Sequence, residues 1–287
     1  MPEHLGECEG QQYVEMCGLL YRYMEGEITF ADVKVHAVYK LLNLKPSGRT
    51  LMPAEEEDKW SNIYKMSELI ESFFEERNGR KIMRVDYFHN PVPRFRPLWK
   101  YYYGPADAMA NITFGEYLDC LRLFMEHGCS RNEKHLYLMA AILYRKAKPL
   151  PWLQKMLPGY KGDIRRKYNE HTAEEQARSA FKYCPKGFIY GVYLMFASFQ
   201  KFITTAVVPW GGRNLDLSIL FDESEGEFKE AVPGLGMDGV AYALAENGQL
   251  GNFDKVRNTN LWEVFMLLYH LKKNELDRKL NEKHQKS

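Results

Sequence analysis

The chain has few cysteines and no paired cysteine motif. The five are odd in number and never form a C-x-x-C pair: Cys8, Cys17, Cys120, Cys129 and Cys184. This spacing argues against a disulfide framework and a zinc site, and it favours a reducing compartment. The first ten residues, MPEHLGECEG, lack a basic region leading into an apolar segment. We therefore predict no signal peptide and a cytoplasmic location.

Charge of one sign is not in excess, and long apolar runs are missing. Thirty-nine basic and thirty-eight acidic side chains leave a formal charge of +1, so no overall field favours nucleic acid or anionic lipid. The longest apolar stretch starts at Gly187 and is interrupted by Gln200 and Lys201. Spanning a bilayer takes roughly 20 apolar residues, so we expect a buried helix there and no membrane contact.

Sequence signatures of catalysis are missing as well. There is no H-E-x-x-H, G-x-S-x-G or Walker motif, and the eight histidines lie singly. His127, Cys129 and His135 offer three metal ligands where a closed site needs four, so a helix junction with Gly128 ending one helix is the preferred interpretation. We predict no metal, no cofactor and no enzyme activity, although an active site assembled from distant residues is an alternative.

The stretch GLGMDG, Gly234 to Gly239, has the spacing of a dinucleotide-binding fingerprint, and Asp254 follows at a suitable distance. Such a site needs a buried strand before the glycines and a βαβ unit around them. Glu227, Glu230 and Pro233 are unfavourable in such a buried strand. The residues after the glycines predict two helices. We therefore predict a turn that opens a short helix, with Gly248 at its end, and no NAD binding.

Helical periodicity dominates what is present. The apolar spacing predicts helices over 11–24, from Pro53 to near Gly79, and over 114–126, 133–145, 173–183, 188–204, 237–246 and 261–281. Two helix N-termini have a similar local sequence. Thr29 with Asp32 and Thr113 with Glu116 predict capping boxes there, and we attribute the similarity to convergence rather than duplication. Only 81–88 is strand-like. The fold class is mainly α: a multi-helix globular protein with long irregular connections and at most a minor strand element.

Prolines and loop composition suggest the domain boundaries. Pro91, Pro93, Pro97 and Pro105 forbid regular helix between residues 79 and 111. We predict an N-terminal helical subdomain (1–78), a proline- and aromatic-rich connection (79–111) and a C-terminal helical domain (112–287) with a charged terminal helix. Residues 210–233 form a second long connection, and loops of this length are usually functional or mobile.

The proline–aromatic connection is the main candidate contact surface. Its candidate residues are Tyr87, Phe88, Arg94, Phe95, Arg96, Trp99, Tyr101, Tyr102 and Tyr103, with Lys100 among them. Tyr, Trp and Arg are common anchors of protein interfaces, so a protein partner is the preferred function. Stacking of single-stranded nucleic acid is the less favoured alternative, because the net charge gives it no support. The rings could instead cover the helical core.

The C-terminal helix carries a second candidate surface. Beyond His270 it is mostly charged, and Leu276 and Leu280 are isolated hydrophobic residues at helical spacing. Such a composition is typical of a solvated helix end. The sharper alternative is that this stripe mediates homo-oligomerisation or docking.

Two stretches resemble known proteins. The first resembles uncharacterised prophage proteins of gut anaerobic bacteria, and it consists of YYYGPADAMANITFGEYLDCLRLF followed by HLYLMAAILYR. The second is similar to phage tail-assembly proteins of that kind, and it consists of GMDGVAYALAENGQLGNFDKVRNTNLWEVFMLL and the charged tail after it. The resemblance covers about Lys100–Lys146 and Met237 to the end. It implies a chaperone-like or virion-associated factor of tail assembly that binds protein and catalyses nothing. It transfers no functional residue.

Overall fold

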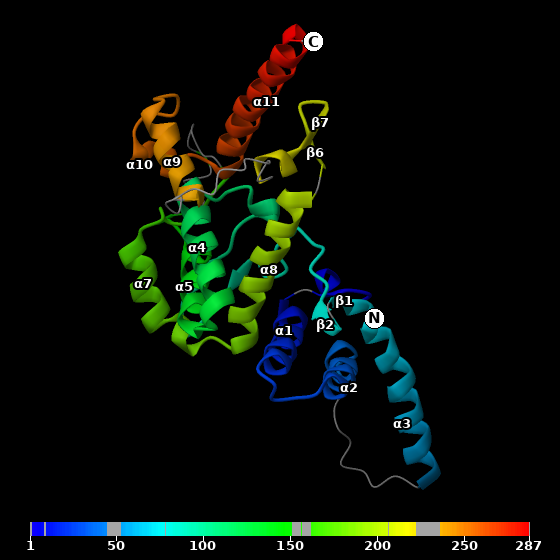
Figure 1. Ribbon diagram of the computed structural model, residues 1–287. Coiled ribbons are helices and arrows are strands. Elements are labelled where there is room, and N and C mark those ends of the chain that lie inside the picture. Colours follow the sequence, from blue (N-terminus) through cyan, green and yellow to red (C-terminus); the bar gives the residue numbers. More distant parts are fainter. Residues whose placement is uncertain are drawn as a thin grey trace.

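The protein is mainly helical, as the periodicity predicts (Figure 1). The computed structural model describes residues 2–8, 10–44, 53–77, 79–150, 156, 162–205, 207–221 and 236–286. The α-helices are α1 (Gly10–Met24), α2 (Phe30–Leu41), α3 (Pro53–Glu68), α4 (Phe114–Ser130), α5 (Glu133–Leu143), α7 (Glu170–Ser179), α8 (Lys186–Thr205), α9 (Gly236–Glu246), α10 (Phe253–Asn258) and α11 (Leu261–Lys286).

Helix α8 is the centre of the molecule. It packs against α1 on one side and α5 on the other, and Figure 1 shows it between these two groups of helices. Most of the side chains along this helix are buried, including Phe188, Phe196 and Phe199. The predicted apolar run is therefore a core helix. No helix in the described part of the chain is long and apolar enough to cross a membrane.

Close approach of α1 and α8 depends on glycine. A Cβ atom added to Gly187 would lie 2.1 Å from the carbonyl oxygen of Val14 and 2.7 Å from the amide nitrogen of Gly18. Real atoms do not approach backbone so closely, so only glycine allows the two helices to contact at this point.

Both predicted capping boxes are confirmed. Thr29 accepts a hydrogen bond from the amide of Asp32, and the Asp32 carboxylate accepts from the amide of Thr29. Thr113 and Glu116 make the same reciprocal pair at the start of α4. Each box satisfies two amides that the helix itself leaves without acceptors.

In the described residues, three small antiparallel sheets accompany the helices. Strands β1 (Phe74–Arg77) and β2 (Arg80–Met83) form a hairpin, as do β6 (Val207–Trp210) and β7 (Arg213–Asp216). Strands β3 (Arg94–Phe95), β4 (Tyr102–Tyr103) and β5 (Arg145–Lys146) form a three-stranded sheet in that order. Only β2 was anticipated by the strand-like segment 81–88, and part of the predicted connection 210–233 is the second hairpin.

Several predicted helix ends are wrong. The helix that begins at Pro53 ends at Glu68, and a 3₁₀ turn and β1 follow it, with Phe73 buried at the end of the turn and Phe74 buried at the start of the strand. Helix α4 continues through Gly128 and ends at Ser130, followed by the C-cap residue Arg131 with a left-handed φ of 54°. The pattern over 133–145 includes Arg145, which lies in β5, and α10 was missed altogether.

One continuous core joins the described elements. It contains side chains from α1, α4, α8 and α11, such as Leu20, Tyr117, Phe199 and Phe265. The irregular connection 84–101 is fixed to this core by Asn90, whose side chain donates to the carbonyl of Pro105 and accepts from Tyr144. The division at residues 78 and 111 stays a prediction, and side chains from both sides of it share the core.

Candidate functional site

The predicted contact residues fall into a buried group and an exposed group. Tyr87 and Tyr102 are only 5% and 2% exposed, and Phe95 stacks on Phe188 of α8 with ring centres 3.8 Å apart. Tyr102 packs edge-on against Phe181. Tyr87 and Tyr102 therefore belong to the core, and Phe95 is half-buried against it. The alternative that the rings cover the helices therefore holds for this part of the segment.

The exposed group lies on β3 and on the turn between β3 and β4. We call it the basic–aromatic surface: Arg94, Arg96, Leu98, Trp99, Lys100 and Tyr101. Trp99 is 84% exposed, Leu98 56% and Tyr101 45%. The guanidinium groups of Arg94 and Arg96 lie 5.4 and 5.3 Å from the centre of the Tyr101 ring. Cation–π contacts therefore hold the two arginines and Tyr101 together.

The backbone at the tip of this turn is strained. Leu98 has a φ of 59°, in the left-handed region that costs an L-residue on the order of 1–2 kcal/mol. Pro97 before it is buried, whereas Leu98 and Trp99 point into solvent. Strain of this kind persists only where the surroundings enforce it, and it is concentrated at functional sites. Here it presents two large apolar side chains to solvent.

The remaining predicted contact residues lie elsewhere. Tyr103 is half-buried opposite Arg94 and Arg145 in the sheet. Phe88 is exposed but packs against Phe202 of α8, outside the basic–aromatic surface. Leu276 and Leu280 are 37% and 55% exposed on the part of α11 that projects from the body (Figure 1). A role for these leucines in oligomerisation stays a prediction.

The fold adds cations that the sequence analysis missed. Lys146 on β5 lies over the Tyr102 ring, 5.7 Å from its centre. Burial lowers the pKa of Lys146, and repulsion from Lys100 and Arg166 lowers it further, so these three charges are neighbours. The basic runs at 146–148 and 165–167 were the available signal, but only the pairing of β5 with β4 brings them to the exposed turn.

The glycine fingerprint falls on helices. Gly236 and Gly239 lie in the first turn of α9, and Asp254 lies on α10, while Gly234 lies outside the described residues. From residue 236 to 286 the described chain forms helices and no strand. Gly248 ends α9 with a φ of 68°, as predicted. The βαβ context that a dinucleotide site requires is not formed by this part of the chain.

The three predicted metal-ligand candidates do not converge. The ring of His127 bonds the carbonyl of Asn132 through Nδ1 at 3.1 Å and packs edge-on against Tyr193. Cys129 is exposed, and His135 lies 3.5 Å from Glu126. Within the described residues, no group of three or more His, Cys, Asp or Glu side chains is arranged to hold a metal ion.

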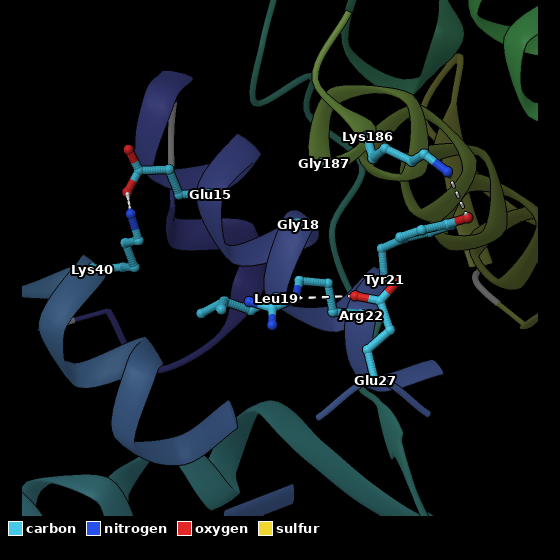
Figure 2. A pocket seen from close by; sticks show the side chains of 9 residues that line it. All are labelled: Glu15, Gly18, Leu19, Tyr21, Arg22, Glu27, Lys40, Lys186 and Gly187. Carbon is cyan, nitrogen blue, oxygen red and sulfur yellow. Dashed lines mark hydrogen bonds and ion pairs between the residues drawn. The ribbon is translucent and has the colours of Figure 1, made fainter. Parts of the chain in front are cut away.

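A pocket of about 400 Å³ lies between α1, α2 and the start of α8 (Figure 2). Its charged side chains neutralise one another. Glu15 pairs with Lys40 and Arg22 with Glu27, each at 3.2 Å. Lys186 pairs with Glu133 and lies 3.4 Å from the hydroxyl of Tyr21, which donates to the same carboxylate.

Neither Tyr21 nor Lys186 in this pocket is activated as a general base or a nucleophile. Burial, together with the hydrogen bond to Glu133, raises the pKa of Tyr21 to about 12. Partial burial opposes the charge on Lys186, but its bonds to Glu133 and Tyr21 prevail and raise its pKa above the usual value. Both groups therefore stay protonated at neutral pH, whereas a general base or nucleophile must lose its proton.

Comparison with known proteins adds no identity. No protein-family model, curated protein or solved structure matches the chain.

Proposed function

We propose that this protein is a non-enzymatic interaction protein that binds an acidic protein partner through the basic–aromatic surface. The observation that carries the proposal is Trp99, an 84% exposed tryptophan on a strained turn beside two arginines stacked on Tyr101. Tryptophan, tyrosine and arginine are the residues most enriched among interface anchors. A large exposed ring held on a fixed turn loses little conformational entropy on binding.

The charge of this surface indicates the kind of partner. Arg94, Arg96 and Lys100 are exposed, and none of them forms an ion pair with another described residue. Unpaired cations around an apolar anchor suit a partner that offers an apolar pocket ringed by carboxylates. Assembly of phage tails, which the sequence resemblance implies, is proposed as the setting of this interaction.

Single-stranded nucleic acid is the weaker candidate for the same surface. Proteins that bind it present a platform of several rings on which successive bases stack. Here Tyr87 and Tyr102 are buried, and Phe95 is stacked on Phe188. Tyr101 is flanked by two arginines. Trp99 is the one ring of the described turn that is largely exposed to solvent. A single exposed ring suits an interface anchor better than a platform on which successive bases stack.

Affinity capture tests this proposal. The purified full chain, Trp99→Ala and the control Trp210→Ala are immobilised and exposed to extract of the native host. We expect the wild type and the control to retain the same acidic protein, identified by mass spectrometry, and Trp99→Ala to lose at least tenfold of it. Equal retention by Trp99→Ala would contradict the proposal.

A second arm separates the nucleic-acid alternative. The anisotropy of a labelled oligothymidine is measured at low and moderate salt. Saturable binding that collapses with salt and disappears in Trp99→Ala would favour nucleic acid, because phosphate contacts release counterions.

A further inference from the structure

A second pocket, independent of the interaction surface proposed above, lies between β5, residues 166–169 and α7. It encloses about 270 Å³, just below the size range of roughly 300–1,000 Å³ that is usual for drug-sized ligands. Its charged lining residues are Arg145, Lys146, Arg166, Lys167 and Glu175. Four of these carry a positive charge and only Glu175 carries a negative one.

The cations of this pocket are held close together by the backbone. The amide of Arg166 donates to the carbonyl of Lys146 at 2.9 Å, and Ala147 bridges to Arg165. This pairing places the basic run of β5 beside the basic run at 165–167. Lys146, Arg166 and Lys167 form no ion pair with another described residue, so their charges are left for a ligand.

Two buried polar side chains of the wall have unused hydrogen-bonding groups. Arg145 is 5% exposed, and its Nε and Nη1 have no partner although its Nη2 pairs with Glu116. Gln176 is 9% exposed, and its Oε1 has no partner. Rotation of this amide by half a turn would offer its NH₂ group instead. Buried donors without acceptors are costly, so the Nε and Nη1 groups of Arg145 point to an anionic acceptor in the pocket.

Helix α7 adds to the positive potential. Asn169 caps its first turn by accepting from the amide and hydroxyl of Thr172, and both residues line the pocket. The start of a helix carries a partial positive charge and favours anions. Glu170 in this turn does not line the pocket and lies 3.9 Å from Arg122.

We infer that this pocket binds a small phosphate-class oxyanion, either inorganic phosphate or the phosphoryl group of a small monoester. Lys146, Arg166, Lys167 and the capped start of α7 surround it, and the Arg145 guanidinium lies in the wall behind. Because Arg145 is already paired with Glu116, the three cations Lys146, Arg166 and Lys167 against the one carboxylate Glu175 leave an excess of two positive charges, which suits a dianion better than a single carboxylate. Glu175, which also lines the pocket, favours the charged form of Lys146.

Titration calorimetry of the full chain tests the inference, in chloride buffer at constant ionic strength. The ligands are inorganic phosphate, phosphoserine and acetate. Saturable binding of phosphate or phosphoserine, with acetate at least tenfold weaker, is the expected result. Tighter binding of phosphoserine would assign the site to a monoester, and tighter binding of phosphate to the free ion. Absence of saturable binding of both phosphate ligands, or acetate binding equally well, would overturn the inference.

Matched variants separate a specific site from general charge. Lys146→Gln with Lys167→Gln removes two cations of the pocket, one of which contacts a ring. Lys134→Gln with Lys182→Gln removes two cations outside it, and Lys182 likewise contacts a ring. We expect at least a tenfold loss of phosphate affinity in the first pair and less than a twofold loss in the second. Equal losses would overturn the inference. If the first pair does not fold, Lys167→Gln alone is expected to lose at least threefold, and no loss would overturn it.

Discussion

Glu116 Oε1 lies 2.7 Å from Arg145 Nη2, and the two side chains are 1% and 7% exposed. The other oxygen of Glu116 accepts the amide of Thr113 in the capping box of α4. One carboxylate thus caps a helix and neutralises an arginine from a strand. Burial lowers the pKa of Arg145 to about 10, against the favourable effect of Glu116, so the arginine is still charged at neutral pH and needs its partner.

We expect Glu116→Gln to destabilise the protein by about 3–5 kcal/mol, because it leaves a buried guanidinium without its main counter-charge. Glutamine can still form the capping box, so the loss of stability measures the effect of removing the negative charge. Urea unfolding monitored by circular dichroism measures it. The control Glu126→Gln, exposed on the same helix, should change stability by less than about 0.5 kcal/mol. A loss below about 1 kcal/mol in Glu116→Gln would mean that the pair contributes little.

Trp99→Ala and Tyr102→Ala are expected to have opposite effects although only two residues lie between the two positions. Removal of the 84% exposed Trp99 should change the unfolding free energy by less than about 0.5 kcal/mol. Removal of the 2% exposed Tyr102 should cost about 3–5 kcal/mol through loss of buried ring contacts. Tyr102→Phe keeps the ring and should be nearly neutral. Similar melting temperatures for the two alanine variants would contradict this division.

These two predictions also show what the sequence could and could not reveal. The capping box of Thr113 and Glu116 is local, so its residue types and spacing predicted it correctly. The partner of Glu116 could not be predicted, because Arg145 is 29 residues away and meets it only through the fold. In the aromatic segment, Trp99 and Tyr102 have the same local character. Tyr102 is buried because it lies in the two-residue strand β4, whereas Trp99 lies in the turn before this strand. The strand pairs with β5, which is more than 40 residues away in the sequence, so its formation is a long-range event.

Gly187→Ala should disrupt the contact between α1 and α8. The added Cβ would lie 2.1 Å from the carbonyl oxygen of Val14, so the helices must separate, at a cost of at least about 1–3 kcal/mol. Gly18→Ala on the facing helix is the matched control. Its Cβ would meet nothing closer than 3.6 Å, and alanine favours the helix, so a neutral or slightly stabilising effect is expected. Thermal melting of both variants checks the pair, and equal melting temperatures would contradict the close contact.

His127 should make stability depend on pH below neutrality. Burial lowers its pKa, outweighing the bond to the carbonyl of Asn132, which acts in the opposite direction. Because the folded pKa is lower than the unfolded value of about 6.5, its contribution is complete above pH 6.5. That contribution is lost as pH falls toward the folded pKa. His127→Gln should therefore show a smaller fall in melting temperature between pH 7.5 and 5.5 than the wild type. The exposed His171→Gln should retain the wild-type slope, and an unchanged slope in His127→Gln would refute this assignment.

The most direct test of the interaction surface is site-specific photo-crosslinking. A benzophenone amino acid replaces Pro93, an exposed residue next to Arg94 that is not part of the basic–aromatic surface, in chains that carry Trp99, Trp99→Ala or the control Trp210→Ala. After irradiation in extract of the native host, we expect one discrete adduct with an acidic protein. It should be present with Trp99 and with Trp210→Ala, and reduced at least tenfold by Trp99→Ala. An adduct of equal yield in all three chains, or no discrete protein adduct in any of them, would contradict the claim that Trp99 anchors a protein partner.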